Sequence, residues 1–324
     1  MREALELART VDLRADVNPH VGAVIVSANG DIVGRGWHEG AGSVHAEIMA
    51  LEQAGDQAHG ATLYCTLEPC NAHGKQPPCS QAILESGITK VVFGQYDPNP
   101  TKSGGAHMLS TAGIEVESRL LEQESQTLNA SWNFAHEHNR PWVMWKTATT
   151  LDGFIAASDG TSQWITSEES RAKVQELRVG VGAILTGTGT VLKDNPQLTV
   201  RGAKRQPLAA VIGARPIPKD FHVAARALVY SDIDHALGSL WDEFKVHRVL
   251  VEAGPGLTGS LWSAGVIDEV WWFQAPVLMG TGMSAVGDIG VKTLAQALRF
   301  SELEVNRVGL DLMVHFSTHD VTPN

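Results

Sequence analysis

The chain has 324 residues, 43% of them hydrophobic, and a formal net charge of −11, so it can form two globular domains. The negative charge argues against a general nucleic-acid-binding protein, which needs a basic face. Three cysteines are too few for a disulfide framework, and acidic residues stand where a signal peptide would have its apolar core. Because no apolar run approaches the ~20 residues of a membrane helix, we expect a cytoplasmic protein with no membrane partner.

The first half of the sequence is predicted to alternate strands with helices. The Asn29-Gly30 pair is typical of a hairpin turn between two strands. Strands are expected at residues 21–26, 32–37, 61–66, 91–93 and 114–116. Helices are expected at about 4–11, 45–54, 81–86 and 108–112, followed by one polar helix over 120–138. This alternation indicates an α/β domain over residues 1–139.

The second half restarts the alternation. Strands are expected at residues 142–148, 183–185, 249–251 and 270–273. Thr166 and Glu169 resemble a capping box for a helix that reaches Val179. Two glycine-rich segments, 186–190 and 254–256, each follow a strand and precede a helix, which suggests cradles for phosphate. Either segment alone could equally be an ordinary tight turn. We predict a second α/β domain over residues 140–324.

The strongest chemical signal is the ordered set His45, Glu47, Cys70 and Cys79. One imidazole and two thiolates are typical ligands of a catalytic Zn²⁺ whose fourth position is open to water. Zinc makes that water a nucleophile at neutral pH, and Glu47 is placed to move its protons. This order of residues is typical of zinc-dependent nucleobase deaminases. The alternative is that His45 is an ordinary helix residue and that Cys70 and Cys79 are buried cysteines with structural roles only. We expect such a structural role for Cys65, which lies in an apolar strand.

Longer motifs resemble the bifunctional pyrimidine deaminase/reductase family of riboflavin biosynthesis. In the first half the matching motifs are N-P-H-V-G (18–22), H-A-E (45–47), T-L-E-P-C (66–70), P-P-C (77–79) and D-P-N-P (97–100). In the second half they are residues 146–148, 151–153, 162–166, 190–191, 194–196, 198–201 and 251–254. The eight-residue gap between Cys70 and Cys79 is also a family feature. The resemblance implies a cytidine-deaminase-like α/β/α domain followed by a dihydrofolate-reductase-like α/β domain.

The resemblance also implies two successive reactions on a small pyrimidine ribose phosphate. Zinc hydroxide would remove the ring amine of 2,5-diamino-6-(5-phosphoribosylamino)pyrimidin-4(3H)-one, with Glu47 as the catalytic proton shuttle. NADPH would then reduce the ribosyl group of the product to ribityl. The implied cofactors are therefore Zn²⁺ and NADPH.

Further site residues follow from the same resemblance. NADPH would contact Ala148, Trp164, Thr190, Asp194, Gly254, Pro255, Gly256, Leu257, Thr258, Gly259 and Ser260. The substrates would contact Asn18 in the deaminase half and Ser162, Arg178, Leu198, Arg201 and Glu252 in the reductase half. Arginines suit a sugar phosphate because they can bind it bidentately. Ordinary alternatives stay open: a turn residue for Asn18, surface charges for the arginines, core packing for Trp164, and strand-end roles for Lys146 and Asp152.

Four positions depart from the family pattern: Val17, Ala23, Ala72 (followed by His73) and Ala253. We also considered a deaminase whose second domain only binds, a nucleic-acid or free-nucleoside deaminase, and a zinc scaffold without activity. Asp194, Arg201 and Glu252 argue against the first alternative. The net charge argues against the second, and Glu47 beside an open zinc position argues against the third. A homo-oligomer is left open, since the apolar residues 270–273 fit a core or an interface.

Overall fold

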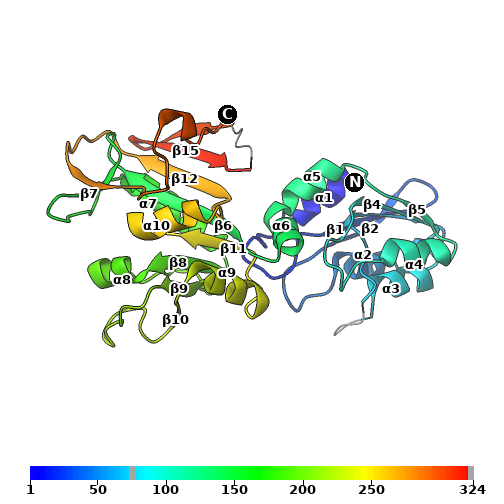
Figure 1. Cartoon of the computed structure of the whole chain (residues 1–324). Helices are drawn as coiled ribbons and strands as arrows, with labels where there is room; N and C mark the ends of the chain where they lie inside the picture. Colours follow the sequence, from blue (N-terminus) through cyan, green and yellow to red (C-terminus); the bar gives the residue numbers. More distant parts are fainter. Residues whose placement is uncertain (73–76, 320–324) are drawn as a thin grey trace. The chain divides into compact units, whose positions relative to one another are not determined.

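The computed structural model describes residues 1–72 and 77–319. The chain forms two compact units, Met1–Asn139 and Arg140–Asn324 (Figure 1). In the part of the chain that is described, no helix is both long and apolar enough to span a membrane.

A five-stranded sheet organises the first unit, in the order β2-β1-β3-β4-β5. Its strands are β1 (Gly22–Val26), β2 (Ile32–Trp37), β3 (Thr62–Leu67), β4 (Lys90–Gln95) and β5 (Glu115–Glu117). The helices are α1 (Arg2–Ala8), α2 (Ala46–Ala54), the 3-10 helix η1 (Gly55–Ala58), α3 (Cys79–Glu85), α4 (Gly105–Thr111), α5 (Glu122–Leu128) and α6 (Ala130–His138). Strand β1 runs antiparallel to β2 and β3, whereas β3, β4 and β5 are parallel. The five predicted strands of this half are all present.

Small residues bring α2 unusually close to the sheet. A Cβ built on Gly36 of β2 would lie 1.9 Å from the carbonyl oxygen of Ala46, and one on Gly34 would lie 2.2 Å from that of Ala50. Ala46 and Ala50 are four residues apart, so they share the buried face of the helix. Only glycine in β2 allows this approach, which fixes the first turn of α2.

The predicted polar helix over residues 120–138 is wrong as a single element. It is two helices, α5 and α6, which meet at Asn129. The buried Asn129 side chain accepts a hydrogen bond from the backbone N–H of His20 (2.8 Å) and donates one to the carbonyl of His20 (2.9 Å). This pairing with a distant loop offers the backbone an alternative to a continuous helix. The first helix also ends at Ala8, before Val11.

The second unit is built on an eight-stranded sheet in the order β10-β9-β8-β11-β6-β12-β15-β14. Its strands are β6 (Trp142–Thr149), β8 (Ala183–Gly187), β9 (Leu208–Ile212), β10 (Ala227–Tyr230), β11 (Arg248–Val251), β12 (Glu269–Gln274), β14 (Glu304–Val308) and β15 (Asp311–Ser317). Strands β7 (Phe154–Ala157) and β13 (Gly282–Ser284) form a separate pair. The helices are α7 (Glu168–Val179), α8 (Thr188–Asp194), α9 (Ile233–Asp242), α10 (Pro255–Ser263) and the 3-10 helix η2 (Leu294–Gln296). The first six strands in this order, from β10 through β9, β8, β11 and β6 to β12, are parallel. Strand β15 is antiparallel to its two neighbours, β12 and β14.

The predicted capping box of α7 is wrong, although the helix does reach Val179. Ser167 is the N-cap, and its hydroxyl accepts from the backbone N–H of Ser170. The buried carboxylate of Asp311 fixes this turn, because it accepts from the backbone N–H of Ser167 (2.8 Å) and the hydroxyl of Ser170 (2.6 Å). Sequence proximity favoured Thr166 and Glu169, but a carboxylate from β15 sets the start of the helix.

Candidate active sites

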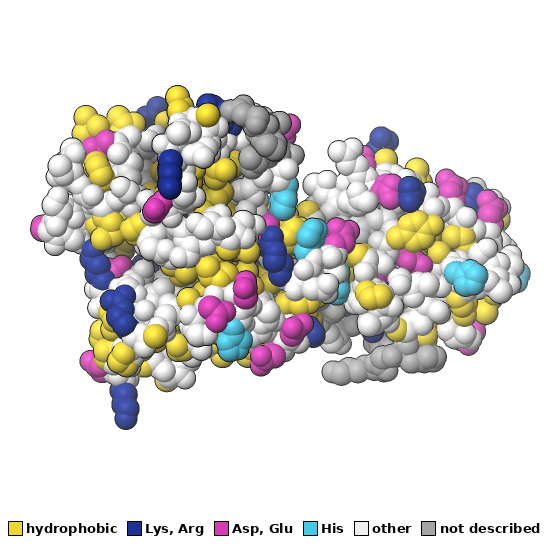
Figure 2. All heavy atoms as spheres, in the orientation of Figure 1, with side chains coloured by type: hydrophobic (Ala, Val, Ile, Leu, Met, Phe, Trp, Pro, Cys, Tyr) yellow, Lys and Arg dark blue, Asp and Glu magenta, His cyan; other side chains and the backbone are white. Residues whose placement is uncertain are grey.

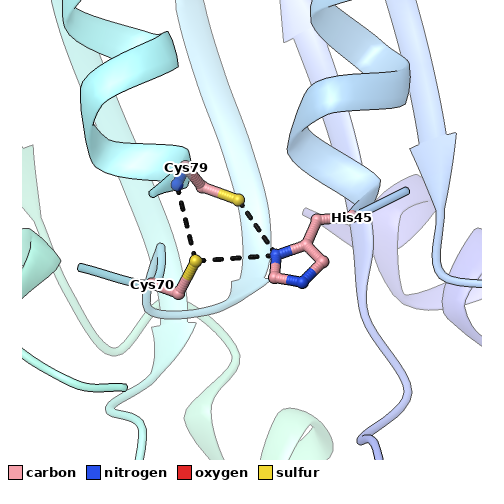
Figure 3. Close-up of side chains that lie close together, drawn as sticks. All are labelled: His45, Cys70 and Cys79. Atoms are coloured by element: carbon pink, nitrogen blue, oxygen red, sulfur yellow. Dashed lines mark hydrogen bonds between the residues drawn. The ribbon is translucent and has the colours of Figure 1, made fainter. Parts of the chain in front are cut away.

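His45, Cys70 and Cys79 converge in the first unit, as the sequence predicts (Figure 3). His45 is the N-cap of α2, Cys70 follows β3, and Cys79 begins α3. The Nδ1 atom of His45 lies 3.1 Å from Sγ of Cys79 and 3.5 Å from Sγ of Cys70. The three ligand atoms all lie within 4.8 Å of one another.

This donor set fits zinc. Bonds of about 2.3 Å to sulfur and 2.0–2.1 Å to nitrogen put tetrahedral ligand atoms roughly 3.5–3.8 Å apart, which is close to the separations found. Three protein ligands leave the fourth position for water or substrate, as in catalytic sites. Residues 73–76 of the intervening loop, which include His73, lie outside the described residues.

Hydrogen bonding within the cluster favours one thiolate. Contacts with Cys79 and His45 lower the pKa of Cys70 to about 4. The contact with Cys70 in turn raises the pKa of His45. Bonding to Cys70 and burial raise the pKa of Cys79. A bound cation would supply the positive charge that two adjacent thiolates require.

Glu47 stands in the first turn of α2, close in sequence to the ligand His45. It is only 4% exposed, and burial, together with the negative charge of Cys70, raises its pKa to about 7. A carboxyl group that can gain or lose a proton near neutral pH suits general acid–base catalysis. Glu47 is therefore not a solvated residue of the helix surface.

Asn18 lies in a polar chain that leads toward the cluster. Its Nδ2 atom is 3.0 Å from Nε2 of His38, whose Nδ1 atom is 3.1 Å from the carbonyl oxygen of Val44. The rings of His38 and His45 meet edge to face, with centroids 5.7 Å apart. Sequence reasoning missed His38, which carries no motif signal because its role depends on the pairing of β1 with β2.

Glu68 is a second buried residue that the sequence did not single out. Its carboxylate accepts from the backbone N–H groups of Asp97, Gly104 and Ala106 at 3.0–3.3 Å. It thereby ties the loop after β4 to the segment that carries Cys70. Burial, with the charges of Glu68 and Cys70, raises the pKa of Asp97 to about 7. The T-L-E-P-C motif contained Glu68, but only the structure shows its three partners.

The second unit contains a cavity of about 640 Å³ beyond the carboxyl ends of parallel strands. This edge is where ligands bind in open α/β sheets. Most residues predicted for the cofactor line it: Ala148, Trp164, Thr190, Asp194, Gly254, Pro255, Gly256 and Leu257. Trp164 is 66% exposed, which excludes the alternative of core packing.

Three predicted cofactor residues are not among those that line this cavity. The Thr258 hydroxyl donates to the carbonyl oxygens of Gly254 and Pro255, and the Ser260 hydroxyl donates to that of Gly256. A Cβ on Gly259 would lie 3.0 Å from the carbonyl oxygen of Asp288. These three residues therefore shape helix α10 and its packing.

A second cavity, of about 600 Å³, is lined by Arg178, Leu198, Arg201 and Glu252, four residues predicted to contact substrate. The fifth residue predicted for substrate in the reductase half, Ser162, lines the first cavity. Lys146 and Glu252 line both cavities, so the two spaces adjoin at the ends of β6 and β11.

Two predicted substrate residues are paired with each other. Arg178 donates from Nε and Nη2 to the two oxygens of Glu252, at 2.7 and 2.9 Å, and from Nη1 to the carbonyl of Thr199. Both side chains are 17% exposed. Burial alone would raise the pKa of Glu252, but Arg178 outweighs it and holds that pKa below its usual range. Burial also lowers the pKa of Lys146. The alternative of a solvated surface charge does not apply to Arg178.

Asp152 has structural partners. Its carboxylate accepts from the Thr150 hydroxyl at 2.5 Å and from the backbone N–H groups of Met279 and Gly280. It therefore joins the turn after β6 to the segment before β13, and it lines neither described cavity.

Two family models match the chain. The cytidine and deoxycytidylate deaminase zinc-binding region covers residues 1–95, and the RibD C-terminal domain covers residues 141–314. The riboflavin biosynthesis protein RibD of Mycobacterium tuberculosis is 43% identical over 307 residues, which is 91% of this chain and 90% of that protein. RibD of Aquifex aeolicus is 39% identical over 350 residues, 98% of each chain.

Solved structures agree with this likeness. Acinetobacter baumannii RibD superposes with a TM-score of 0.89 at 34% identity, covering 100% of this chain and 97% of the other. A Thermotoga maritima diaminohydroxyphosphoribosylaminopyrimidine deaminase/5-amino-6-(5-phosphoribosylamino)uracil reductase has a TM-score of 0.83 at 35% identity, with the same coverage. The chain belongs to the RibD family of riboflavin biosynthesis, as a bifunctional enzyme with a zinc-dependent deaminase domain and an NADPH-dependent reductase domain.

Proposed function

We propose that this chain deaminates 2,5-diamino-6-(5-phosphoribosylamino)pyrimidin-4(3H)-one and then reduces the ribosyl group of the product to ribityl. The similar Thermotoga maritima protein, which is named as a deaminase and a reductase of this kind, supports this substrate. The observation that carries the proposal is the His45, Cys70 and Cys79 cluster with the buried carboxyl of Glu47 beside it. The substrate is a small molecule and no nucleic acid is needed. The free thiols of the cluster suit the reducing cytoplasm.

In the deaminase domain, His45, Cys70 and Cys79 would hold zinc, which when bound supplies an activated water. Glu47 takes a proton from that water and returns protons to the ring nitrogen and the departing amine. Its pKa near 7 lets it act in both directions at neutral pH. Asn18, whose Nδ2 atom lies 3.0 Å from Nε2 of His38, would hydrogen-bond the pyrimidine.

In the reductase domain, the larger cavity would hold NADPH, which supplies the hydride when bound. The backbone of Gly254 and Gly256 lies at the start of α10, where N–H groups suit the cofactor pyrophosphate. Lys146 and Glu252 line both cavities, as Arg171 and Asp194 do, so these charged groups can lie near cofactor and substrate together. Arg201, exposed at the rim of the smaller cavity, is available for the substrate phosphate.

A variant assayed on two substrates tests the order of the reactions. Glu47→Gln keeps the shape of the side chain but cannot shuttle protons, so deamination should fall by about 10²–10⁴-fold. The variant should oxidise NADPH at the wild-type rate when given the deaminated intermediate, and should not oxidise it when given the diamino compound. Rapid NADPH oxidation on the diamino compound would refute the order, and failure on both substrates would refute the separation of the sites.

Zinc analysis tests the ligand set. Cys79→Ala should lose the metal and the deaminase activity together. Cys65→Ala is the matched control, because Cys65 is a buried cysteine of β3 outside the cluster. Undiminished zinc in Cys79→Ala, measured by elemental analysis of folded protein, would contradict the assignment.

A further inference from the structure

Four cationic side chains line the larger cavity of the reductase domain: Lys146, Arg171, Lys193 and Arg215. Two of them have clear roles in the protein. Arg171 donates to the carbonyl of Thr166 at 2.7 Å and lies 4.6 Å from the centre of the Trp164 ring. Lys146 lines both cavities, at the end where the substrate space begins.

Lys193 is turned toward a neighbouring loop. Its Nζ atom would lie 3.3 Å from a Cβ on Gly160, and its charge helps to lower the pKa of Asp159. Arg215 lines the larger cavity but not the smaller one, and within the described ranges no hydrogen bond or ion pair joins it to another side chain. Figure 2 shows basic side chains on the surface near α8.

The chain after β9 is shaped to hold Arg215 over the cavity. Gly213 has a φ of +134°, and a Cβ there would lie 2.4 Å from Oγ1 of Thr188. This close approach carries the following residues across the first turn of α8. The Nη2 atom of Arg215 would consequently lie 2.8 Å from a Cβ on Gly189. The absence of a side chain at Gly189 leaves room for the guanidinium.

The sheet order places Arg215 at the adenosine end of the cavity. We place the nicotinamide at the wall that the two cavities share, at its end beside Lys146 on β6 and Glu252 after β11; Arg215 lies outside this shared wall. Arg215 follows β9, and the order β9-β8-β11-β6 puts three strand spacings, roughly 14 Å, between β9 and β6. An extended dinucleotide with its nicotinamide at β6 therefore directs its adenosine toward β9.

We propose that Arg215 binds the 2′-phosphate of NADPH and so gives the reductase its preference over NADH. This inference rests on the proposed cofactor site. Guanidinium groups bind phosphate bidentately, and an arginine near the adenosine ribose is the usual way to accept a 2′-phosphate. NADH presents a neutral hydroxyl at that position, which gives the arginine no charge to pair with.

Calorimetric titration of the full-length protein tests the inference without catalysis. The two ligands are adenosine 2′,5′-bisphosphate, which carries the 2′-phosphate, and adenosine 5′-monophosphate, which lacks it. Arg215→Ala should raise the Kd of the bisphosphate by about 10- to 100-fold, the range of one charged hydrogen-bonding contact. It should leave the Kd of the monophosphate unchanged. Arg215→Lys, which keeps the charge but not the bidentate geometry, should fall between.

Arg299→Ala is the matched control, because Arg299 is an exposed arginine of the same unit and is not among the residues that line either described cavity. It should change neither Kd. An equal rise in the Kd of both ligands in Arg215→Ala would overturn the inference, because that result assigns Arg215 to the 5′-phosphate. An unchanged Kd for both ligands would overturn it as well. If wild-type protein bound neither NADPH nor the bisphosphate, the cofactor site itself would fail, and the inference with it.

Discussion

The charged residues of the reductase site depend on one another. Arg178 and Glu252 form a two-point contact across the smaller cavity, and Lys146 lies close enough for its charge to help lower the pKa of Glu252. Removing one member of a mostly buried pair leaves the other uncompensated, which costs more than the pair itself contributes. The position of Arg178 is therefore set by a carboxylate far away in the sequence.

We predict that Glu252→Gln lowers the free energy of unfolding of the reductase unit by about 2–3 kcal/mol, somewhat less than for a fully buried pair. NADPH oxidation should fall, because Arg178 loses the group that orients it. Glu176→Gln is the matched control, since Glu176 pairs with Lys173 on the surface of α7, the helix that carries Arg178, and its side chain is 65% exposed. It should change stability by less than about 0.5 kcal/mol. Denaturant unfolding of both variants measures this, and equal losses would contradict the prediction.

At the scale of elements, the deaminase site depends on the contact between α2 and β2. The helix carries His45 and Glu47 at its start, and the glycines of β2 allow its backbone to lie directly against the strand. A methyl group at Gly36 would have to push the helix away, since its neighbour is the backbone carbonyl of Ala46.

We predict that Gly36→Ala destabilises the deaminase unit by about 1–3 kcal/mol, the usual cost of overpacking, and lowers both deamination and zinc affinity. Gly238→Ala makes the same change in α9, where the added Cβ meets no atom within 4 Å. Because alanine favours helix, that control should be neutral or stabilising by up to about 1 kcal/mol. Thermal unfolding with zinc titration separates the two, and a fully active Gly36→Ala would refute the packing argument.

The pairing of β12 with β15 contains a pH-sensitive contact. His315 lies 2.8 Å from Glu269 and 3.3 Å from Glu304, and its ring stacks on Trp271. Burial alone would lower the pKa of His315, but the two carboxylates outweigh burial and raise it above 6.5. A raised histidine pKa gives stability that is full below the unfolded pKa and is lost as the pH rises through the folded pKa.

The stability of the reductase unit should therefore fall by about 1 kcal/mol between pH 6 and pH 9 through this pair. In His315→Gln this component should disappear, which flattens the profile. His222→Gln, a change at an exposed histidine, should leave the profile as in the wild type. Unfolding measured across this pH range checks the sign, and a wild-type slope in His315→Gln would exclude the pair as its source.

At the scale of the whole molecule, each unit has a hydrophobic core of its own. Residues of the first core cluster all lie between Val21 and Trp132, and those of the other two lie between Trp142 and Phe316. The metal cluster belongs to the first unit, and both described cavities belong to the second. A ligand that stabilises one folded unit need not affect the other.

Removal of zinc should consequently act on one activity. A strong chelator should abolish deamination and lower the unfolding temperature of the first unit, because metal binding contributes to folding stability. Reduction of the deaminated intermediate should continue at its original rate. Calorimetry and the two separate assays measure this, with re-added Zn²⁺ as the control. Loss of both activities on chelation would show that the units are coupled.

The sequence by itself determined the chemistry of the metal centre and the approximate positions of most elements. His45, Cys70 and Cys79 could be identified because zinc restricts its ligands to a few residue types. Strands such as β1 and β11 could be placed because apolar runs and glycine turns are local patterns. The single helix over 120–138 was wrong because Asn129 pairs with His20, a contact that no local pattern contains.

Only the tertiary structure decided which charges meet. Arg178 and Glu252 are far apart in the chain, and their pairing follows from the order of β8, β11 and β6 in the sheet. Arg215 had no motif, and it reaches the cofactor cavity because β9 lies beside β8 and Gly213 turns the chain inward. Strand order depends on the packing of the whole unit, so the residues it brings together cannot be read from their spacing in the sequence.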